Sequence, residues 1–263
     1  SSQVKVEHHV SRSGAFIKRK NWGERIMNYL KFRKKWFRQR RTSPLILKFL
    51  LMNFYFQIDW WVIKLAKQYD KKGKKLLDVG AGECRYKQYW QQLNYQSQDI
   101  KQNTNKTIDY VGEITKVPAK FDYILCIQVL EHLKQPEAAF REFKRLLKPR
   151  GKVFLTTNFI YQIHMAPDDY WRFTEYGLKY LGESVGFKVE KLAVQGGIFQ
   201  ALAYLLITLP LRIGLEKWLW SYWLYIIVFS PVIMIINLIA VGLDRFIKTK
   251  SLAINYGVVY RKI

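Results

Sequence analysis

LLDVGAGEC, residues 76–84, is the stretch that decides the fold of this chain. Its two leucines, aspartate and valine are typical of a buried parallel strand, and its glycines allow a sharp turn against a ligand. A helix is predicted immediately afterwards, over residues 85–93. The spacing Asp78-x-Gly80-x-Gly82-x-Cys84 lacks the third glycine of the dinucleotide fingerprint, and no Lys-Ser/Thr pair follows as in a P-loop. The turn therefore predicts a pocket for a nucleotide-type cofactor without a pyrophosphate.

Composition excludes a chain that is disordered throughout, because 49% of its 263 residues are apolar. The formal net charge of +24 implies attraction to a polyanion, either nucleic acid or an anionic membrane. Nine tryptophans, 17 tyrosines and 16 phenylalanines favour the membrane, where aromatic rings gather at the lipid–water boundary. The two cysteines have no metal-ligand spacing, so the sequence predicts no metal site and a reducing compartment. The chain begins at Ser1 without methionine, which is consistent with a processed or truncated N-terminus.

The first 70 residues are predicted to form a basic, aromatic helical arm. Residues 5–41 are rich in Lys and Arg, and two interpretations remain open: a solvated, partly disordered arm, or a basic helix lying on anionic lipid. Residues 44–61 are strongly apolar but are interrupted by Lys48, Gln57 and Asp59. They predict an interfacial or domain-packing helix rather than a membrane span.

The central part of the chain alternates predicted strands and helices. Strands are expected over residues 75–79, 95–100, 108–111, 121–127, 152–157 and 188–194, with helices from Pro136 and from the capping residue Thr174. The short link between the second and third strands leaves no room for the usual crossover helix. This alternation predicts an α/β fold with a doubly wound sheet.

At this point the motifs resemble a known family. LLDVGAGEC, Asp99, VGEITKVP at 111–118 and the segment from FDYILCIQVLEHL to LKPRGKVFLTT are similar to class I S-adenosylmethionine-dependent methyltransferases, of the small-molecule group that includes ubiquinone-biosynthesis enzymes. The resemblance covers about residues 75–194. It implies a Rossmann-like seven-stranded sheet with S-adenosyl-L-methionine as cofactor.

The resemblance also implies roles for individual residues. Asp78, Gly80 and Gly82 are expected to hold the methionine end of the cofactor, and Asp99 its ribose hydroxyls. Glu113 is expected at the adenine amino group, and Gln128 at the methionine end or the acceptor. The sequence departs from the family pattern at Cys84, at Arg150 and at Glu113, where aspartate is usual.

His132 is the candidate catalytic base, because a histidine at the pocket mouth can accept the proton of an acceptor hydroxyl. A structural histidine bonded to backbone is the alternative. The loop HMAPDDYWRFT, residues 164–174, follows the fifth strand and is similar to a loop in part of the family. It predicts an acceptor site; a brace formed by an internal Asp–Arg pair is the alternative. The candidate acceptor-binding residues are His164, Asp168, Asp169, Tyr170, Trp171 and Arg172.

An apolar segment, residues 198–243, is inserted before the final strand predicted over residues 252–261. Residues 218–243 carry no charge and exceed the roughly 20 residues that cross a bilayer. Because the final strand must return to the sheet, both ends of this apolar hairpin should lie on one side of the membrane, whether its two helices span the bilayer, re-enter it or lie in its plane. Arg245, Lys248, Lys250 and the basic arm then place the domain on the cytoplasmic side. Two buried helices of a soluble protein are the alternative.

The sequence thus predicts four parts: an arm over residues 1–70, a cofactor-binding domain over 71–197, the apolar hairpin over 198–243 and the last strand over 244–263. The expected function is methyl transfer, at oxygen, to a lipid-linked, glycan or quinone-like amphiphilic acceptor at an anionic membrane. Nucleic acid is disfavoured as acceptor, because the place after residue 126 reads Ile-Gln-Val-Leu rather than the Asn/Asp-Pro-Pro-aromatic element of base methylation. A membrane scaffold without turnover is the remaining alternative.

Overall fold

The structure is a computed structural model that describes residues 45–51, 53–212, 219–247 and 252–263. Predictions that fall on residues 1–44, including the basic arm, lie outside the described residues. So do those on Lys248 and Lys250, and the part of the apolar hairpin over residues 213–218, where Glu216 and Lys217 are expected to form its turn. The described residues all belong to one compact unit.

Seven strands form one sheet among the described residues, in the order β3-β2-β1-β4-β5-β7-β6. The strands are β1 (Lys75–Val79), β2 (Asn94–Asp99), β3 (Tyr110–Val111), β4 (Phe121–Ile127), β5 (Leu147–Asn158), β6 (Phe187–Gln195) and β7 (Asn255–Lys262). The pairs from β3 to β5 are parallel, whereas β7 lies antiparallel between β5 and β6. Strand order reverses between β1 and β4, and ligands of open α/β sheets bind beyond the carboxyl ends of strands at such a point. The predicted doubly wound sheet with a final antiparallel strand is confirmed.

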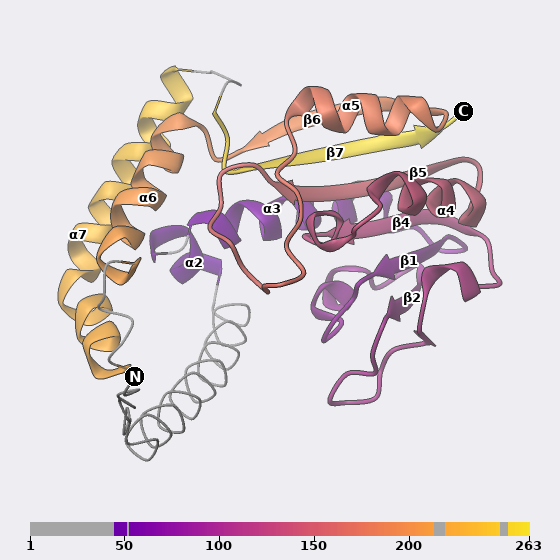
Figure 1. Ribbon diagram of the computed structural model, residues 1–263, viewed down its shortest axis with the longest axis horizontal. Coiled ribbons are helices and arrows are strands. Elements are labelled where there is room, and N and C mark those ends of the chain that lie inside the picture. The colour runs from indigo at the N-terminus through magenta and orange to yellow at the C-terminus, as the bar shows by residue number, and fades with distance from the viewer. Residues whose placement is uncertain (1–44, 52, 213–218, 248–251) are drawn as a thin grey trace, which may run out of the picture. The chain divides into compact units, whose positions relative to one another are not determined.

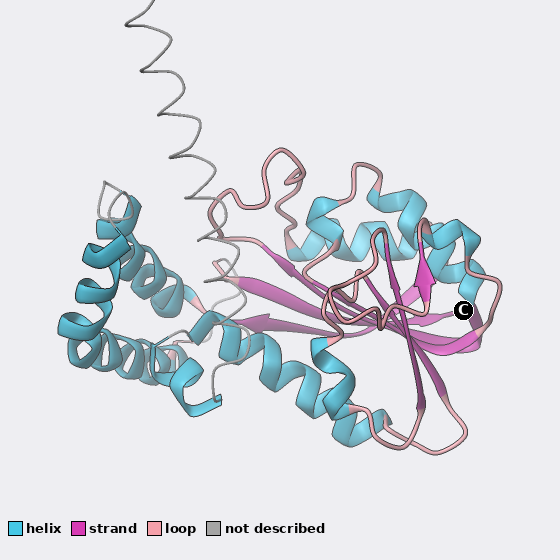
Figure 2. Cartoon of the chain, turned by 90° about the horizontal axis from the view of Figure 1, so that it is seen from below, coloured by secondary structure: helices cyan, strands magenta, loops and turns pink. Residues whose placement is uncertain are grey.

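Helices cover both faces of the sheet, as Figure 2 shows. The helices are α2 (Leu45–Leu51), α3 (Asn53–Tyr69), α4 (Pro136–Leu146), α5 (Glu175–Ser184), α6 (Ile198–Arg212) and α7 (Leu219–Phe246), with the 3₁₀ turns η1 (Arg85–Tyr89), η2 (Ile114–Lys116) and η3 (Leu130–His132). Thr174 caps α5 as predicted, because its side chain accepts a hydrogen bond from the Gly177 N–H at 3.0 Å. The apolar stripe of α4 is buried at Ala139, Phe140, Phe143 and Leu146.

Helix α3 belongs to the packed domain. Its face formed by Ile58, Trp61, Val62 and Leu65 is buried. Of the two interpretations of residues 44–61, domain packing therefore describes α3. The buried Asp59 carboxylate pairs with Lys48 of α2 at 2.8 Å and with Arg85 of η1, so α2, α3 and η1 are joined by one ionic cluster.

Three predicted elements differ from the structure. The helix expected over residues 85–93 ends at Tyr89, because the Asp70 carboxylate accepts the N–H groups of residues 91–93 and holds them out of a helix. The third strand shrinks to two residues because the Asp109 carboxylate bonds Ser97 where a ladder bond would form. Strand β5 begins at Leu147 rather than at residue 152. Its pairing with β4 shifts register between Phe121 and Tyr123, so Pro149, which has no N–H to donate, is not needed in the hydrogen-bond ladder.

Helices α6 and α7 lie beside each other at the end of the sheet where the parallel strands terminate (Figure 1). Residues 227–246 of α7 are long and apolar enough to cross a membrane, and only 17% of the most apolar window of this segment is buried. Helix α6 is a shorter apolar helix. The Asp244 carboxylate ties the pair together, since it accepts the N–H groups of Phe199 and Gln200 at 3.0 and 3.1 Å. The two predicted helices of the apolar hairpin are present, and their relation to a membrane stays a prediction.

Candidate functional site

The glycine turn after β1 brings bare backbone to the carboxyl edge of the sheet. Gly80 has φ +65° and Gly82 has φ +53°, both in the left-handed region. A Cβ on Gly80 would lie 2.6 and 2.9 Å from the two γ-carbons of Val129, whereas a Cβ on Gly82 would meet nothing within 4 Å. Cys84, which stands where the family pattern has its third glycine, also has a left-handed backbone conformation, with φ 51°. Gly80 therefore permits close packing against Val129, two residues beyond the end of β4, and Gly82 leaves space for a ligand.

Asp99, at the end of β2, closes this turn. Its Oδ2 accepts the Gly82 N–H at 2.9 Å, and its Oδ1 lies 3.4 Å from the Lys101 N–H. The parallel pairing of β1 with β2 places this carboxylate beside the turn. Sequence reasoning placed Asp99 at the end of the second strand, and the structure agrees.

We expect Asp99→Ala to weaken binding of S-adenosylmethionine roughly tenfold, or about 1.5 kcal/mol, because the turn loses an acceptor and a ribose hydroxyl would lose its partner. Isothermal titration of the folded variant measures this. Asp109→Ala is the matched control, since Asp109 bonds Ser97 behind the turn. Unchanged affinity in Asp99→Ala would show that the ribose contact is misassigned.

Asp78 is the buried acid of the site. Desolvation raises its pKa to about 7, although the Tyr95 hydroxyl donates a hydrogen bond to Oδ2 at 2.5 Å. A buried carboxylate with this pKa gains from a cationic ligand, which is the charge that the methionine end of the expected cofactor carries. Tyr95 was not predicted, because its position beside Asp78 arises from the pairing of two strands.

Glu113 and Gln128 occupy the predicted ends of β3 and β4. Glu113 is exposed, and its carboxylate accepts the Thr115 hydroxyl at 3.4 Å; Gly112 before it has φ +114° and open space at its Cβ position. Gln128 has φ 57°, and its amide donates to Thr156 Oγ1 at 3.2 Å and to Asn255 Oδ1 at 3.4 Å. Its side chain is thus turned toward β5 and β7.

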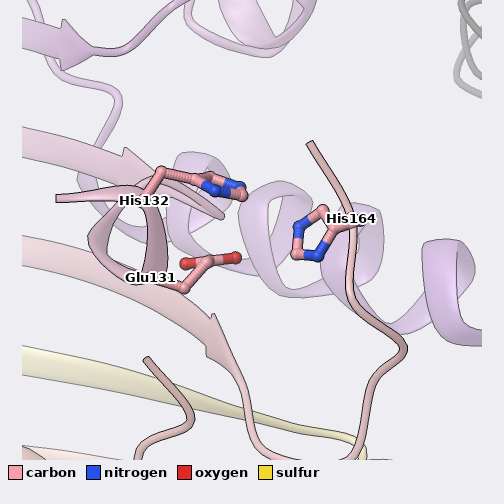
Figure 3. Close-up of side chains that lie close together, drawn as sticks. All are labelled: Glu131, His132 and His164. Atoms are coloured by element: carbon pink, nitrogen blue, oxygen red, sulfur yellow. The ribbon is translucent and has the colours of Figure 1, made fainter. Parts of the chain in front are cut away.

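Glu131, His132 and His164 converge at the edge of the site, as Figure 3 shows. Their possible ligand atoms all lie within 4.8 Å of one another. Glu131 is buried, accepts Thr157 Oγ1 and Asn158 Nδ2 at 2.9 and 2.8 Å, and has a pKa raised to about 7 by desolvation. Burial and His132 lower the pKa of His164 to about 4, so this ring is neutral at neutral pH. Carboxylate and imidazole are metal-ligand types, and the sequence did not predict their meeting, which depends on the path of the loop after β5.

His132 is oriented by backbone. Its Nδ1 lies 2.5 Å from the Asp168 carbonyl oxygen, and its ring meets the His164 ring edge-on with centroids 4.6 Å apart. Because a carbonyl only accepts hydrogen bonds, Nδ1 must carry the proton of the neutral ring. The lone pair is then on Nε2, and this nitrogen is the one that can take up a proton.

The acceptor-site loop is braced from within. Arg172 binds both Asp169 oxygens, at 2.7 and 2.8 Å, and also donates to the Gln162 carbonyl. Asp169 in turn accepts the backbone N–H of His164 at 2.8 Å. Burial alone would raise the pKa of Asp169, but the hydrogen bonds from Arg172 and from the His164 backbone outweigh it and lower this pKa to about 2. These bonds favour the brace for Asp169 and Arg172. Tyr170 and Trp171 keep 39% and 41% of their surface exposed and are the ligand-facing candidates.

The site residues fit a nucleoside-type cofactor with a cationic end. Open space at Gly82 and Gly112 gives a ligand access to backbone, and Asp78 and Asp99 offer carboxylates beside that space. The charges also match, because the buried Asp78 carboxyl suits a cationic group and the Asp99 carboxylate at the sheet edge can accept hydrogen bonds from hydroxyl groups. The structure thus gathers Asp78, Gly80, Gly82 and Asp99 in one place, with Gln128 and Glu113 on neighbouring strand ends.

Comparisons with known proteins agree with this geometry. A family model described as "Methyltransferase domain" matches residues 57–191, just over half of the chain. Relatives include "Ubiquinone biosynthesis O-methyltransferase" of Coxiella burnetii, 32% identical over 84 residues (32% of this chain, 30% of the relative). The protein of that name from Dechloromonas aromatica is 31% identical over 121 residues (38% of this chain, 50% of the relative). The chain thus matches about a third to a half of the length of these curated relatives.

Among solved structures, Burkholderia thailandensis 1,6-didemethyltoxoflavin-N1-methyltransferase, with bound 1,6-didemethyltoxoflavin and S-adenosylhomocysteine, is similar with a TM-score of 0.53. The match covers 98% of this chain and 93% of that chain at 14% identity. At this identity the likeness concerns the fold alone. It confirms the predicted α/β architecture.

Proposed function

The chain belongs to the methyltransferase domain family, and from this premise we propose that it transfers a methyl group from S-adenosylmethionine to the oxygen of an amphiphilic, lipid-linked or quinone-like acceptor at a membrane. The observation that carries the proposal is the glycine turn closed by Asp99 at the strand-order reversal. Similarity to relatives named ubiquinone biosynthesis O-methyltransferase favours oxygen and a quinone-like acceptor. These relatives are matched over only part of their length, so the acceptor is a proposal.

The bound cofactor supplies an already activated methyl group on a sulfonium, so the protein mainly aligns the acceptor and excludes water. Asp78, Gly80 and Gly82 would hold the methionine end, Asp99 the ribose and Glu113 the adenine. His132 Nε2 would take up the proton that the acceptor hydroxyl loses. The bond from His132 Nδ1 to the Asp168 carbonyl keeps the ring in the tautomer that this step needs.

The test is transfer of labelled methyl groups from S-adenosylmethionine into detergent-solubilised total membrane extract, with identification of the labelled species. We expect a labelled lipid-soluble product. Label that appears only in added RNA or DNA would favour the nucleic-acid alternative. If calorimetry shows that S-adenosylmethionine binds but no fraction acquires label, the alternative of a membrane scaffold without turnover would be favoured.

Membrane association is supported by the outward surfaces of α6 and α7. Their exposed apolar side chains include Leu202, Leu206, Leu209, Leu224, Ile227, Val228, Val232, Ile235 and Ile239. Soluble monomers rarely expose so continuous an apolar surface. Arg245, exposed at the domain end of α7, agrees with a domain on the cytoplasmic side.

We expect the protein to stay in the membrane fraction after washing with 1 M salt or alkaline carbonate. Salt screens charge attraction over about 3 Å at that concentration, whereas burial of apolar surface is not screened. Fractionation and immunoblotting measure this. A chain lacking residues 1–41 is the control and should also be retained; complete release of the full chain by salt would make the apolar hairpin a soluble subdomain.

The exposed rings of the loop give a second measurable expectation. Tyr170→Ala should raise the KM for the acceptor about tenfold and leave cofactor affinity nearly constant, because the ring is exposed and its hydroxyl donates to Asp168, two residues before it in the same loop. Arg172→Ala is the contrasting variant, since losing the brace should lower thermal stability and cofactor affinity together. If Tyr170→Ala behaves like Arg172→Ala, the loop is structural and the acceptor site lies elsewhere.

A further inference from the structure

Three amide side chains stand in a row across the last three strands of the sheet. Asn158 ends β5, Asn255 begins β7 and Gln195 ends β6, and Asn255 is the register partner of both others. Partners in register direct their side chains to the same face of a sheet. These three residues, called the amide row below, are 0%, 0% and 3% exposed. Strands β5, β7 and β6 are adjacent in Figure 1.

The amide row has hydrogen-bonding atoms without partners. Among the described residues, Asn158 Oδ1, Asn255 Nδ2 and both terminal atoms of Gln195 are buried and unpaired. Trp61 of α3 covers the same place, because Trp61 and Gln195 both lie within 3 Å of the position that a Cβ on Gly257 would take. The Trp61 indole N–H is also buried and unpaired. Buried polar groups are normally hydrogen-bonded, so five such atoms in one place are unusual and need a partner that the described chain does not supply.

The amide row lies next to the methyl-transfer site. Gln128 donates to Asn255 Oδ1, and its chain neighbour Val129 packs against Gly80 of the glycine turn. Gln128 itself is only half-buried, so it borders the accessible part of the site. A group reaching past Gln128 would meet the amide row while the rest of its molecule stays near His132 and the turn.

The chemistry of the free atoms defines what fits. Three donors (Asn255 Nδ2, Gln195 Nε2 and Trp61 Nε1) and two acceptors (Asn158 Oδ1 and Gln195 Oε1) carry no net charge. The buried Glu131 carboxylate is bonded to Asn158 and would repel an anion. Lys191 is exposed, and its ammonium group lies over the Trp61 ring face, 5.1 Å from the ring centroid. Hydroxyl or carbonyl groups therefore suit the row, and phosphate or carboxylate groups do not.

We propose that the amide row, with Trp61, recognises the uncharged, oxygen-bearing head group of the methyl acceptor. That the ligand is the methyl acceptor rests on the proposed function, whereas the location of the site rests on the unpaired buried atoms. It assigns polar recognition to the α3 side of the sheet and leaves the Asp169–Arg172 pair as a brace. A buried, unpaired amide that serves ligand binding lowers the stability of the folded protein, whereas a structural amide raises it. The effect of removing the amide on the melting temperature therefore distinguishes the two roles.

The test compares two probes with related chains, 4-dodecylcatechol and dodecyl phosphate. They are titrated by calorimetry into full-length protein in mild detergent, saturated with S-adenosylhomocysteine. We expect the uncharged catechol to bind at least tenfold more tightly than the phosphate. Gln195→Met, which keeps side-chain length and removes the amide, should weaken catechol binding about tenfold, leave S-adenosylhomocysteine affinity unchanged and leave the melting temperature equal or higher. Lys188→Met, exposed on the same strand, is the matched control.

Equal binding of both probes, no catechol binding, or equal catechol binding by the wild type and Gln195→Met would overturn the proposal. A joint fall in melting temperature and S-adenosylhomocysteine affinity would also overturn it, because the amide would then be structural. Failure of the proposed function looks different. The membrane extract would acquire no label, while selective catechol binding and its loss in Gln195→Met would persist, and the row would be a binding site without methyl transfer.

Discussion

Gly80→Ala should reduce affinity for S-adenosylmethionine by roughly 30-fold, about 2 kcal/mol, and lower the free energy of unfolding by about 2–4 kcal/mol. Two costs combine at this residue. Its φ of +65° is unfavourable for any residue with a Cβ, and the new carbon would lie 2.6 Å from one Val129 γ-carbon. Val129 is β-branched and adjoins Gln128, so its displacement moves the end of β4 as well as the turn.

Gly73→Ala separates these costs. Gly73 also has a positive φ, +81°, but an added Cβ there meets nothing within 4 Å. This control should lose about 1 kcal/mol of stability from backbone strain and no cofactor affinity. Chemical denaturation and calorimetric titration measure both quantities. Equal behaviour of the two variants would mean that the contact with Val129 is not what positions the turn.

Local sequence pattern was sufficient where one segment determines its own structure. The strands over residues 75–79 and 121–127 end where they were predicted, because continuous apolar runs bounded by polar residues specify buried strands. The helix expected after the turn was cut short by Asp70, a residue far from it along the chain. A carboxylate that captures three backbone N–H groups at a distance leaves no local signal.

The same reasoning explains what was found of the site. Asp78, Gly80, Gly82 and Asp99 lie at strand ends, so strand prediction alone brings them to one edge. The bond from Tyr95 to Asp78, the meeting of Glu131 with His164, and the amide row depend on register or on a loop path. None has a spacing that could reveal it. The sequence could not decide whether Asp169 and Arg172 bind the acceptor or brace the loop, because that choice depends on their hydrogen-bond partners in the folded chain.

The second large effect concerns Glu131 and pH. Desolvation raises the pKa of Glu131 to about 7 from an ordinary value of 4.5, so ionisation of this carboxyl opposes folding. The penalty is absent below pH 4.5, grows as pH rises through that value and is complete above about pH 7, where it is on the order of 3 kcal/mol. His164 cannot offset it with a charge at these pH values, because its own pKa is lowered to about 4.

Glu131→Gln should therefore stabilise the protein at pH 8 by about 2 kcal/mol, less than the full penalty because the amide has one oxygen to serve both Thr157 and Asn158. By pH 4 the wild-type carboxyl is neutral in both folded and unfolded protein, so the penalty of about 3 kcal/mol is gone and the variant should be about 1 kcal/mol less stable than the wild type. Urea denaturation between pH 4 and 8 measures the curve. Glu137→Gln, at an exposed carboxylate paired with Arg141, should change stability by only a few tenths throughout. If Glu131→Gln is less stable than the wild type at pH 8, the ionised carboxylate is a net support for the end of β5, and the hydrogen bonds from Thr157 and Asn158 outweigh its desolvation.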